Sequence, residues 1–242
     1  MPDTYVLVHG AWHTGAELEA VAQHLRTAGH TVHCPTLAGN RAGDDRSRTG
    51  LQDAIDSLAE FIEAGDLREV RLVGHSYGGM VISGVAERVL ARLRRLVYVN
   101  AFVPQDGEAL NDLVPPHYVQ MFDAIAAGAN GAVMLPFEIW REVFINDADL
   151  ALAQSSFARL NPQPYKTFTE KIALPRPLAA LPIGKSYLNC LQDTAMPHSL
   201  PWHPRLSERL GLFRLVECMG SHEAWFSSPQ VLAQAVEQAG RD

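Results

Sequence analysis

The chain has 242 residues, of which 47% are hydrophobic and 19% charged, a balance typical of a folded globular protein rather than a disordered one. This length fits a single domain with a large core. The formal net charge is −7, and no run of Lys and Arg could cover a polyphosphate backbone, so we expect neither nucleic acid nor an anionic membrane as a partner.

The cysteines and the start of the chain bear on the cellular compartment. Cys34, Cys190 and Cys218 are far apart in the sequence, and each lies in or beside an apolar run. An odd number of cysteines without paired spacing predicts buried free thiols in a reducing compartment. The first residues show no signal-peptide pattern, and no apolar run approaches the roughly 20 residues of a membrane helix. We therefore expect a cytoplasmic protein.

Strand-like and helix-like segments alternate along the first hundred residues. Apolar runs rich in β-branched residues predict strands, and apolar residues at helical spacing predict helices. The predicted strands are residues 5–8, 31–34, 70–73 and 96–99. The predicted helices are residues 16–28 and 51–64, and a small-residue segment that follows residue 79 and runs to about 92. This alternation predicts a mostly parallel sheet with helices on both faces.

The alternation stops between residues 103 and 182, which are rich in Pro, Met and aromatic residues and show short helical patterns but no convincing strand. It then resumes, with predicted strands at 183–191 and 213–216 and predicted helices near 204–210 and from about 229. An insertion of about 80 residues is too long for a plain loop. We expect residues 1–102 and 183–242 to form an α/β core and residues 103–182 a helical cap over a site.

The segment Gly74-His75-Ser76-Tyr77-Gly78 matches the pattern Gly-x-Ser-x-Gly. It follows a predicted strand and precedes a predicted helix, which is the setting of the nucleophile turn of α/β-hydrolases. Such a strained turn lifts the Ser76 oxygen above the sheet and places the Tyr77 amide at a helix N-terminus, where it can meet negative charge. The pattern predicts a nucleophile at Ser76; the alternative is a tight structural turn.

A serine nucleophile requires a base and an orienting acid, which follow it on this fold in the order acid, then histidine. His222 comes after the last predicted strand and is the expected base, whereas we expect His198 and His203 to be surface residues. Asp193 follows the strand ending near residue 191, at the carboxyl end where parallel sheets bind ligands. Asp106, after the fourth strand, is the alternative acid.

The loop after the first strand, His9-Gly10-Ala11-Trp12, is expected to supply a second oxyanion donor through the Ala11 amide, beside that of Tyr77. His9 and His13 have the i, i+4 spacing of metal ligands. They straddle a strand end and a glycine rather than one helix face, and no third ligand is evident. We therefore expect no metal and no cofactor.

Four segments together resemble the methylesterase/hydroxynitrile-lyase family of α/β-hydrolases, which includes plant methyl salicylate esterases and small bacterial esterases. These segments are residues 6–12, 28–32, 73–80 and 101–104. The resemblance spans nearly the whole chain and is weakest in the predicted cap. It implies an α/β-hydrolase fold with a helical cap and esterase activity.

The resemblance assigns the nucleophile to Ser76, the acid to Asp193, the base to His222 and the oxyanion amides to Ala11 and Tyr77. It therefore favours Asp193 over the alternative acid. The chain departs from the family in two positions. The cyanohydrin-cleaving lyases of the family carry a lysine directly after the catalytic histidine, where this chain has Glu223, and Ser221 replaces the usual Gly or Asp before it. Cyanohydrin cleavage is disfavoured.

These residues predict a serine carboxylesterase that cleaves a small, partly apolar or aromatic ester through an acyl-enzyme, acting as a monomer or homodimer. We expect Trp12, Phe122 and Trp140 to contact the substrate, although cap aromatics can instead form the cap's own core. One alternative is lyase, cyclase or cofactor-free chemistry with the His222–Asp193 pair as base. Another is a ligand-binding sensor that retains the triad.

Overall fold

The computed structural model describes residues 2–242 and contains a six-stranded parallel sheet in the order β2-β1-β3-β4-β7-β8. Its strands are β1 (Thr4–Val8), β2 (Thr31–His33), β3 (Val70–His75), β4 (Leu93–Val99), β7 (Gly184–Cys190) and β8 (Arg214–Cys218). The order places β1, β3, β4 and β7 in the interior, so the loops after these strands meet at the middle of one sheet edge.

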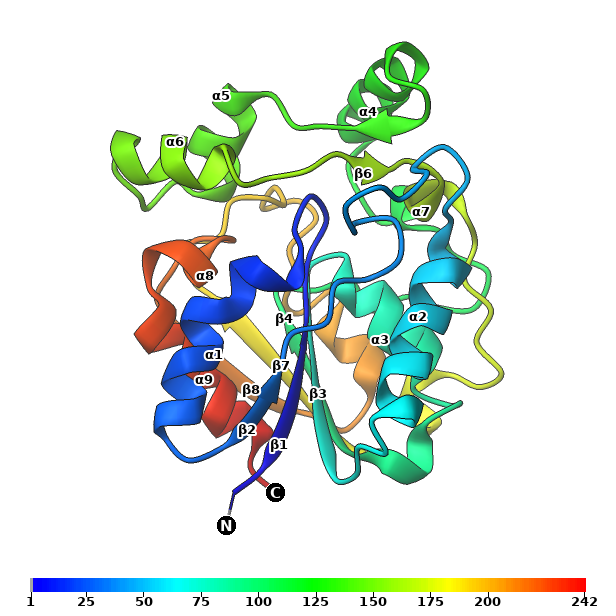
Figure 1. Cartoon of the computed structure of the whole chain (residues 1–242), viewed down its shortest axis with the longest axis vertical. Helices are drawn as coiled ribbons and strands as arrows, with labels where there is room; N and C mark the ends of the chain where they lie inside the picture. The colour runs from blue at the N-terminus through cyan, green and yellow to red at the C-terminus, as the bar shows by residue number, and fades with distance from the viewer. Residues whose placement is uncertain (1) are drawn as a thin grey trace.

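Helices cover both faces of the sheet (Figure 1). One layer contains α1 (Glu19–Thr27), α8 (Ala224–Ser227) and α9 (Pro229–Gly240), and the other contains α2 (Leu51–Ala64) and α3 (Gly78–Val85). Strand β1 shows why two layers form. Tyr5 and Leu7 belong to the core beneath α1 and α9, whereas Val6 and Val8 belong to the core beneath α2 and α3. A strand buried on both faces is apolar throughout.

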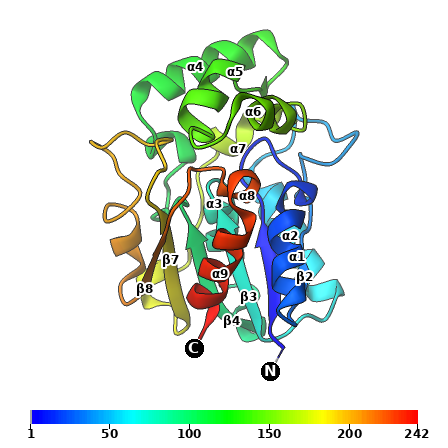
Figure 2. The same cartoon turned by 90° about the vertical axis from the view of Figure 1, so that its left-hand side faces the viewer.

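The segment between β4 and β7 lies above the carboxyl ends of the strands, at the opposite end of the molecule from both termini (Figure 2). It contains α4 (Pro116–Gly128), α5 (Phe137–Ile139), α6 (Leu150–Phe157) and α7 (Lys166–Thr169), and the short strands β5 (Ala132–Val133) and β6 (Gln163–Pro164) pair antiparallel within it. The sequence predicted helices here but no strand. Each strand has two residues, too few to show a period-2 pattern.

Hydrogen bonds from buried Gln163 tie this upper segment to the loop after β1. Its Oε1 accepts from the Trp12 amide at 3.1 Å and from Asn40 Nδ2 at 2.9 Å, while its Nε2 donates to Thr167 Oγ1 at 2.9 Å. The Trp12 indole also donates to the Val133 carbonyl at 3.0 Å. The upper segment therefore packs on the core through satisfied polar groups rather than through apolar contacts alone.

Most predicted elements are confirmed, and the helix over residues 51–64 has the predicted bounds. Two helix predictions are wrong in length. The helix after Ser76 ends at Val85, and the segment near 204–210 forms only the 3₁₀ turn Ser207–Leu210.

The sheet brings two of the three cysteines together. Cys190 and Cys218 are paired in register across β7 and β8, with their Sγ atoms 3.7 Å apart, although they are distant in the sequence. All three cysteines are free thiols, but only Cys190 is buried, so the prediction of buried thiols is wrong for Cys34 and Cys218, which are half-buried. Within residues 2–242, no helix combines the length and the apolar character needed to cross a membrane.

Candidate active site

The turn between β3 and α3 presents Ser76 above the sheet. Ser76 has φ 52°, a left-handed conformation that is strained for a residue with a side chain. The flanking glycines allow the close packing that maintains it. A Cβ on Gly74 would lie 2.8 Å from the Gly78 carbonyl oxygen, and one on Gly78 would lie 2.7 Å from the Val8 carbonyl oxygen. The Gly-x-Ser-x-Gly spacing therefore has a steric cause in this structure.

His222 lies in the loop between β8 and α8, with its imidazole Nδ1 2.6 Å from Asp193 Oδ2. Both side chains are buried. Burial lowers the pKa of His222, but the Asp193 carboxylate, together with that of Glu223, raises the pKa above the ordinary 6.5. Because Asp193 accepts the Nδ1 proton, Nε2 is the ring's acceptor in the neutral form.

Aromatic rings fix the orientation of the His222 imidazole. Trp202 stacks on it with planes 13° apart and centroids separated by 5.3 Å, and Phe144 meets it edge-on at 84° and 5.3 Å. Within the described chain, the imidazole forms its hydrogen bond through Nδ1, while the backbone carbonyl of His222 accepts from His75 Nε2 at 3.0 Å. Within residues 2–242 its Nε2 makes no hydrogen bond to a protein group, and His222 lines the same pocket as Ser76.

Asp193 is held by groups that the sequence analysis missed. Its Oδ1 accepts from the Ala195 amide at 2.7 Å, and its Oδ2 also accepts from Asn100 Nδ2. Asn100 in turn accepts from the Cys190 amide through Oδ1 at 2.7 Å. An amide residue directly after a buried strand was the available signal, because polar groups at the carboxyl ends of parallel strands converge on the site.

The other candidate residues lie away from this pair. Asp106 is exposed, and its carboxylate accepts a hydrogen bond from the Leu174 amide at 2.8 Å, so it stabilises the loop at Leu174. His198 is exposed, and half-buried His203 contacts Ser207 Oγ at 2.6 Å. His9 is occupied as well, because its Nε2 accepts from the Leu37 amide at 3.1 Å. Of the candidate acids, the structure brings only Asp193 to His222.

Ala11 and Tyr77 line the same pocket as Ser76. Both residues are buried, and among residues 2–242 neither amide donates a backbone hydrogen bond to a protein acceptor. Buried amides without partners are rare. The loop that carries Ala11 is held in place because Trp12 adopts φ 66° and its carbonyl accepts from the Asn161 amide at 2.8 Å.

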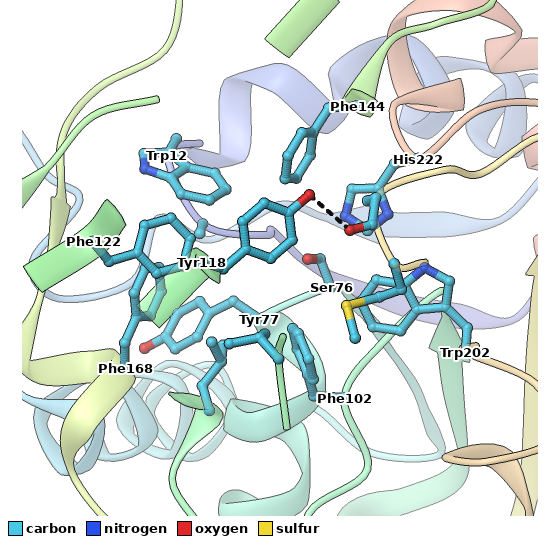
Figure 3. A pocket seen from close by; sticks show the side chains of 15 residues that line it. Trp12, Ser76, Tyr77, Phe102, Tyr118, Phe122, Phe144, Phe168, Trp202 and His222 are labelled. Atoms are coloured by element: carbon cyan, nitrogen blue, oxygen red, sulfur yellow. Dashed lines mark hydrogen bonds between the residues drawn. The ribbon is translucent and has the colours of Figure 1, made fainter. Parts of the chain in front are cut away.

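The pocket above Ser76 is narrow and almost entirely apolar. It encloses about 380 Å³ of space free of atoms, part of it open to solvent. Figure 3 shows Ser76 and His222 facing this space, with Trp12, Phe122 and Phe168 across from them. The lining residues are Ala11, Trp12, Ser76, Tyr77, Phe102, Leu110, Val114, Tyr118, Phe122, Phe144, Phe168, Ala195, Met196, Trp202 and His222. None of them carries a formal charge apart from a protonated His222.

The structure places two of the three predicted substrate-contacting residues in this lining, Trp12 and Phe122. Trp140 does not line the pocket. It is completely buried behind Phe144, with ring planes 12° apart, and its indole donates to Ser156 Oγ at 3.2 Å. Trp140 is therefore packed between the cap and the core, because its ring also contacts the rings of His13 and Phe226.

Comparison with known proteins agrees with this architecture. The model of the "Alpha/beta hydrolase family" matches residues 5–235. A solved structure, described as an extracellular α/β-hydrolase from a Paenibacillus species with structural and functional homology to tobacco salicylic acid binding protein 2, is 36% identical. It covers 100% of both chains with a TM-score of 0.95.

Two relatives are named for the compounds they hydrolyse. The chain is 49% identical over 113 residues to the carbendazim hydrolyzing esterase of Nocardioides sp. (strain SG-4G), a match covering 46% of this chain and 47% of that protein. It is 26% identical over 247 residues to the pyrethroid hydrolase of Sphingobium wenxiniae, covering 96% of this chain and 85% of that protein. The first match thus spans about half of the relative's length.

A parallel sheet that carries a strained serine turn, with an acid and a histidine in the loops after later strands, defines an α/β-hydrolase. The chain belongs to the α/β-hydrolase family, and its relatives are methylesterase-like. The predicted family, fold class and kind of enzyme are confirmed at this level.

Proposed function

We propose that the chain is a serine carboxylesterase whose triad is Ser76, His222 and Asp193. The observation that carries this proposal is the convergence of three features on one pocket: the strained serine turn, the His222–Asp193 pair and two buried amides without protein partners. The residues involved follow four different strands, β1, β3, β7 and β8, so a purely structural turn at Ser76 does not account for the other features.

The proposed reaction has two steps. His222 Nε2 takes the Ser76 proton as Oγ bonds to the ester carbonyl carbon, and the carbonyl electron pair moves onto oxygen between the Ala11 and Tyr77 amides. The intermediate collapses, and the alcohol leaves with the proton held by His222. Water then attacks the acyl-enzyme by the same route and releases the acid. Asp193 keeps the Nδ1 proton in place and stabilises the imidazolium.

The substrate is proposed to be a small neutral ester with an aromatic or apolar part. The pocket is lined by aromatic and aliphatic side chains and presents no Lys, Arg, Asp or Glu to a charged acyl group. The names of the carbendazim and pyrethroid hydrolysing relatives agree with such a substrate. We also propose that residues 103–182 act as the cap that closes this pocket, and that the reaction needs no cofactor.

The compartment and the oligomeric state stay as predictions. A cytoplasmic location and a monomer or homodimer follow from the sequence alone, and the Paenibacillus relative is described as extracellular. Cyanohydrin cleavage stays disfavoured. Position 223 carries a buried carboxylate that faces His13 rather than a cation available to a leaving anion.

Hydrolysis of a panel of p-nitrophenyl esters tests the proposal. We expect the wild type to hydrolyse the acetate and benzoate, and to hydrolyse a 4-carboxybenzoate at least about tenfold more slowly, because the pocket offers the extra carboxylate no partner. Ser76→Ala should abolish turnover of every ester, while Ser199→Ala, at an exposed position, should match the wild type.

Turnover that survives in Ser76→Ala would contradict an acyl-enzyme and favour His222–Asp193 acting as a base alone. Binding of these esters without any turnover by the wild type would favour the sensor.

A further inference from the structure

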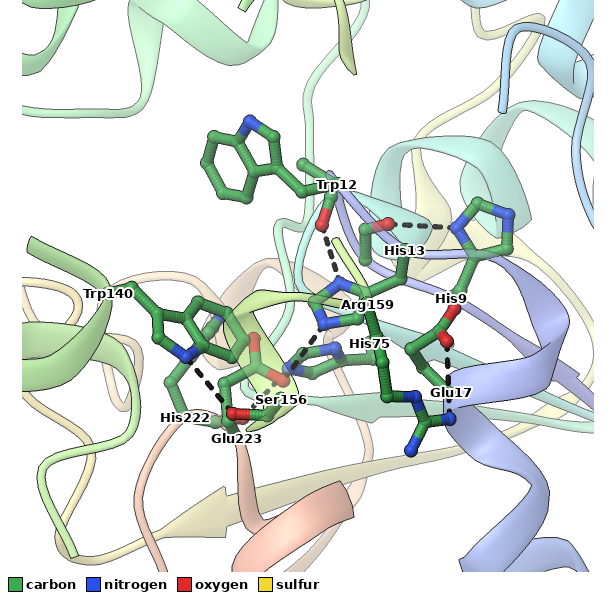
Figure 4. Close-up of polar contacts among 12 residues, drawn as sticks. His9, Trp12, His13, Glu17, His75, Trp140, Ser156, Arg159, His222 and Glu223 are labelled. Atoms are coloured by element: carbon green, nitrogen blue, oxygen red, sulfur yellow. Dashed lines mark hydrogen bonds and ion pairs between the residues drawn. The ribbon is translucent and has the colours of Figure 1, made fainter. Parts of the chain in front are cut away.

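A second buried histidine–carboxylate pair lies directly behind the proposed triad. His13 Nε2 is 3.3 Å from Glu223 Oε2, and their side chains are only 3% and 2% exposed. His13 follows Trp12 on the loop that carries the Ala11 amide, and Glu223 follows His222 on the loop after β8. Figure 4 shows the pair among His75, Trp140 and His222.

The hydrogen bonding of His13 fixes where its proton lies. Its Nδ1 is 2.6 Å from the Ala11 carbonyl oxygen, which can only accept, so Nδ1 carries a proton. Its Nε2 then faces Glu223 Oε2, and two lone pairs would meet there unless a further proton lies between them. Within the described chain neither atom makes a hydrogen bond, to the other or to a third group. The contact is therefore an ion pair without net charge, in which His13 carries two ring protons and Glu223 is a carboxylate.

Few other charged groups face this pair. Glu17 is the second carboxylate near His13, and it is itself paired with Arg159 at 3.2 Å and accepts from the Thr14 amide at 2.8 Å. His75 approaches from β3, with its ring centroid 6.3 Å from that of His13, and burial keeps the pKa of His75 well below 6.5. Burial lowers the pKa of His13 as well, but the Glu223 carboxylate outweighs it and raises that pKa above 6.5.

The hydrogen bonds of the loop at Glu223 run to groups outside the oxyanion loop: the Ser221 amide donates to Asp147 Oδ2 at 3.0 Å, and the His222 carbonyl accepts from His75 Nε2 at 3.0 Å. The Glu223 amide lies 3.1 Å from the Phe144 carbonyl oxygen and 3.2 Å from Ser221 Oγ. Its carboxylate is thus the group that connects the histidine loop to the oxyanion loop.

We propose that His13 and Glu223 are positioning residues that lock the oxyanion loop to the histidine loop, so that the Ala11 amide and the His222 imidazole keep a fixed geometry around Ser76. This inference rests on the proposed esterase function. His13 sets the Ala11 peptide through its carbonyl, and Glu223 sets His222 through the adjoining backbone. The contact thereby joins the two parts of the site that must act on one carbonyl group.

Substitutions can separate this role from a general contribution to folding. Glu223→Met keeps the volume but removes the contact, and His13 becomes neutral in a buried site. Glu223→Gln can retain the contact, because its amide donates to the Nε2 lone pair of neutral His13. His13→Asn keeps a donor near the Nδ1 position but cannot reach Glu223. The double variant His13→Asn/Glu223→Met leaves no buried charge unpaired.

The experiment measures kcat and KM for p-nitrophenyl acetate together with thermal unfolding. We expect Glu223→Met to lower kcat by about 10²-fold with little change in KM, because a small misplacement of reacting groups has that cost. Glu223→Gln should recover most of this loss. The double variant should fold and lose no more kcat than the worse of the two single variants.

The matched control is Glu108→Gln, which removes the half-buried ion pair with Arg209 outside the pocket. This variant should keep the wild-type kcat.

The possible outcomes separate this inference from the proposed function. If the wild type lacks Ser76-dependent turnover, the proposed function fails, and this inference fails with it. If the wild type turns over and Glu223→Met has unchanged kcat, the inference alone is overturned. A change confined to KM, losses that multiply in the double variant, or an equal loss in Glu108→Gln would also overturn it.

Discussion

His222→Ala is expected to lower kcat for p-nitrophenyl ester hydrolysis by about 10⁶-fold, as loss of the base does in serine hydrolases whose triad acts as a unit. The physical reason is that a serine hydroxyl at its ordinary pKa is a poor nucleophile. Within residues 2–242, His222 is the histidine that both lines the pocket and contacts a buried carboxylate. KM should change little, because alanine leaves the aromatic lining in place.

The matched control for His222→Ala is His198→Ala, which removes an exposed histidine from the loop after β7. This variant should keep the wild-type rate. Comparable loss in both variants would indicate a folding defect rather than loss of a base, and thermal unfolding would separate the two. A His222→Ala variant that retains most of its activity would remove His222 from the mechanism.

Asp193→Asn is expected to lower kcat by about 10⁴-fold, because an amide can hold the imidazole in the wrong tautomer. It should also move the acidic limb of the kcat/KM profile to lower pH. The sign follows from the wild type. Asp193, together with Glu223, raises the pKa of His222 above 6.5, and the base works only when neutral, so wild-type activity falls as the pH drops through that raised pKa. Removing the Asp193 carboxylate lowers the pKa.

Asp106→Asn is the control for the acid, since Asp106 is the alternative from the sequence and contacts only the loop at Leu174. Its kcat and pH profile should match those of the wild type. If the acidic limb of the Asp193→Asn profile stays in place, or if Asp106→Asn has the larger effect, the assignment of Asp193 as the orienting acid is wrong.

The sequence was sufficient to predict the core of the site because its parts are local patterns. Ser76 stands in a five-residue motif between a strand and a helix, and Asp193 and His222 each follow a predicted strand. In a parallel sheet, the carboxyl ends of the strands share an edge, so these residues converge without any knowledge of side-chain packing.

The rest depended on packing that no local pattern specifies. Trp140 and Phe122 look alike in sequence, yet the first is buried between the cap and the core and the second lines the pocket. Trp202 stacks on His222, although it lies in a proline-rich segment whose histidines were predicted to be surface residues. The His13–Glu223 contact joins two loops from opposite ends of the chain, and its Glu223 partner was noted only as a departure from a family pattern.

Covalent labelling with a p-nitrophenyl alkylphosphonate tests the central claim most directly, because it reads out the nucleophile without requiring the natural substrate. The account predicts release of about one equivalent of p-nitrophenol per chain, with the phosphonyl group located on Ser76 by peptide mass spectrometry and no labelling of Ser76→Ala. Labelling at another residue, or an unmodified Ser76 in a wild-type enzyme that hydrolyses esters, would contradict an acyl-enzyme on Ser76.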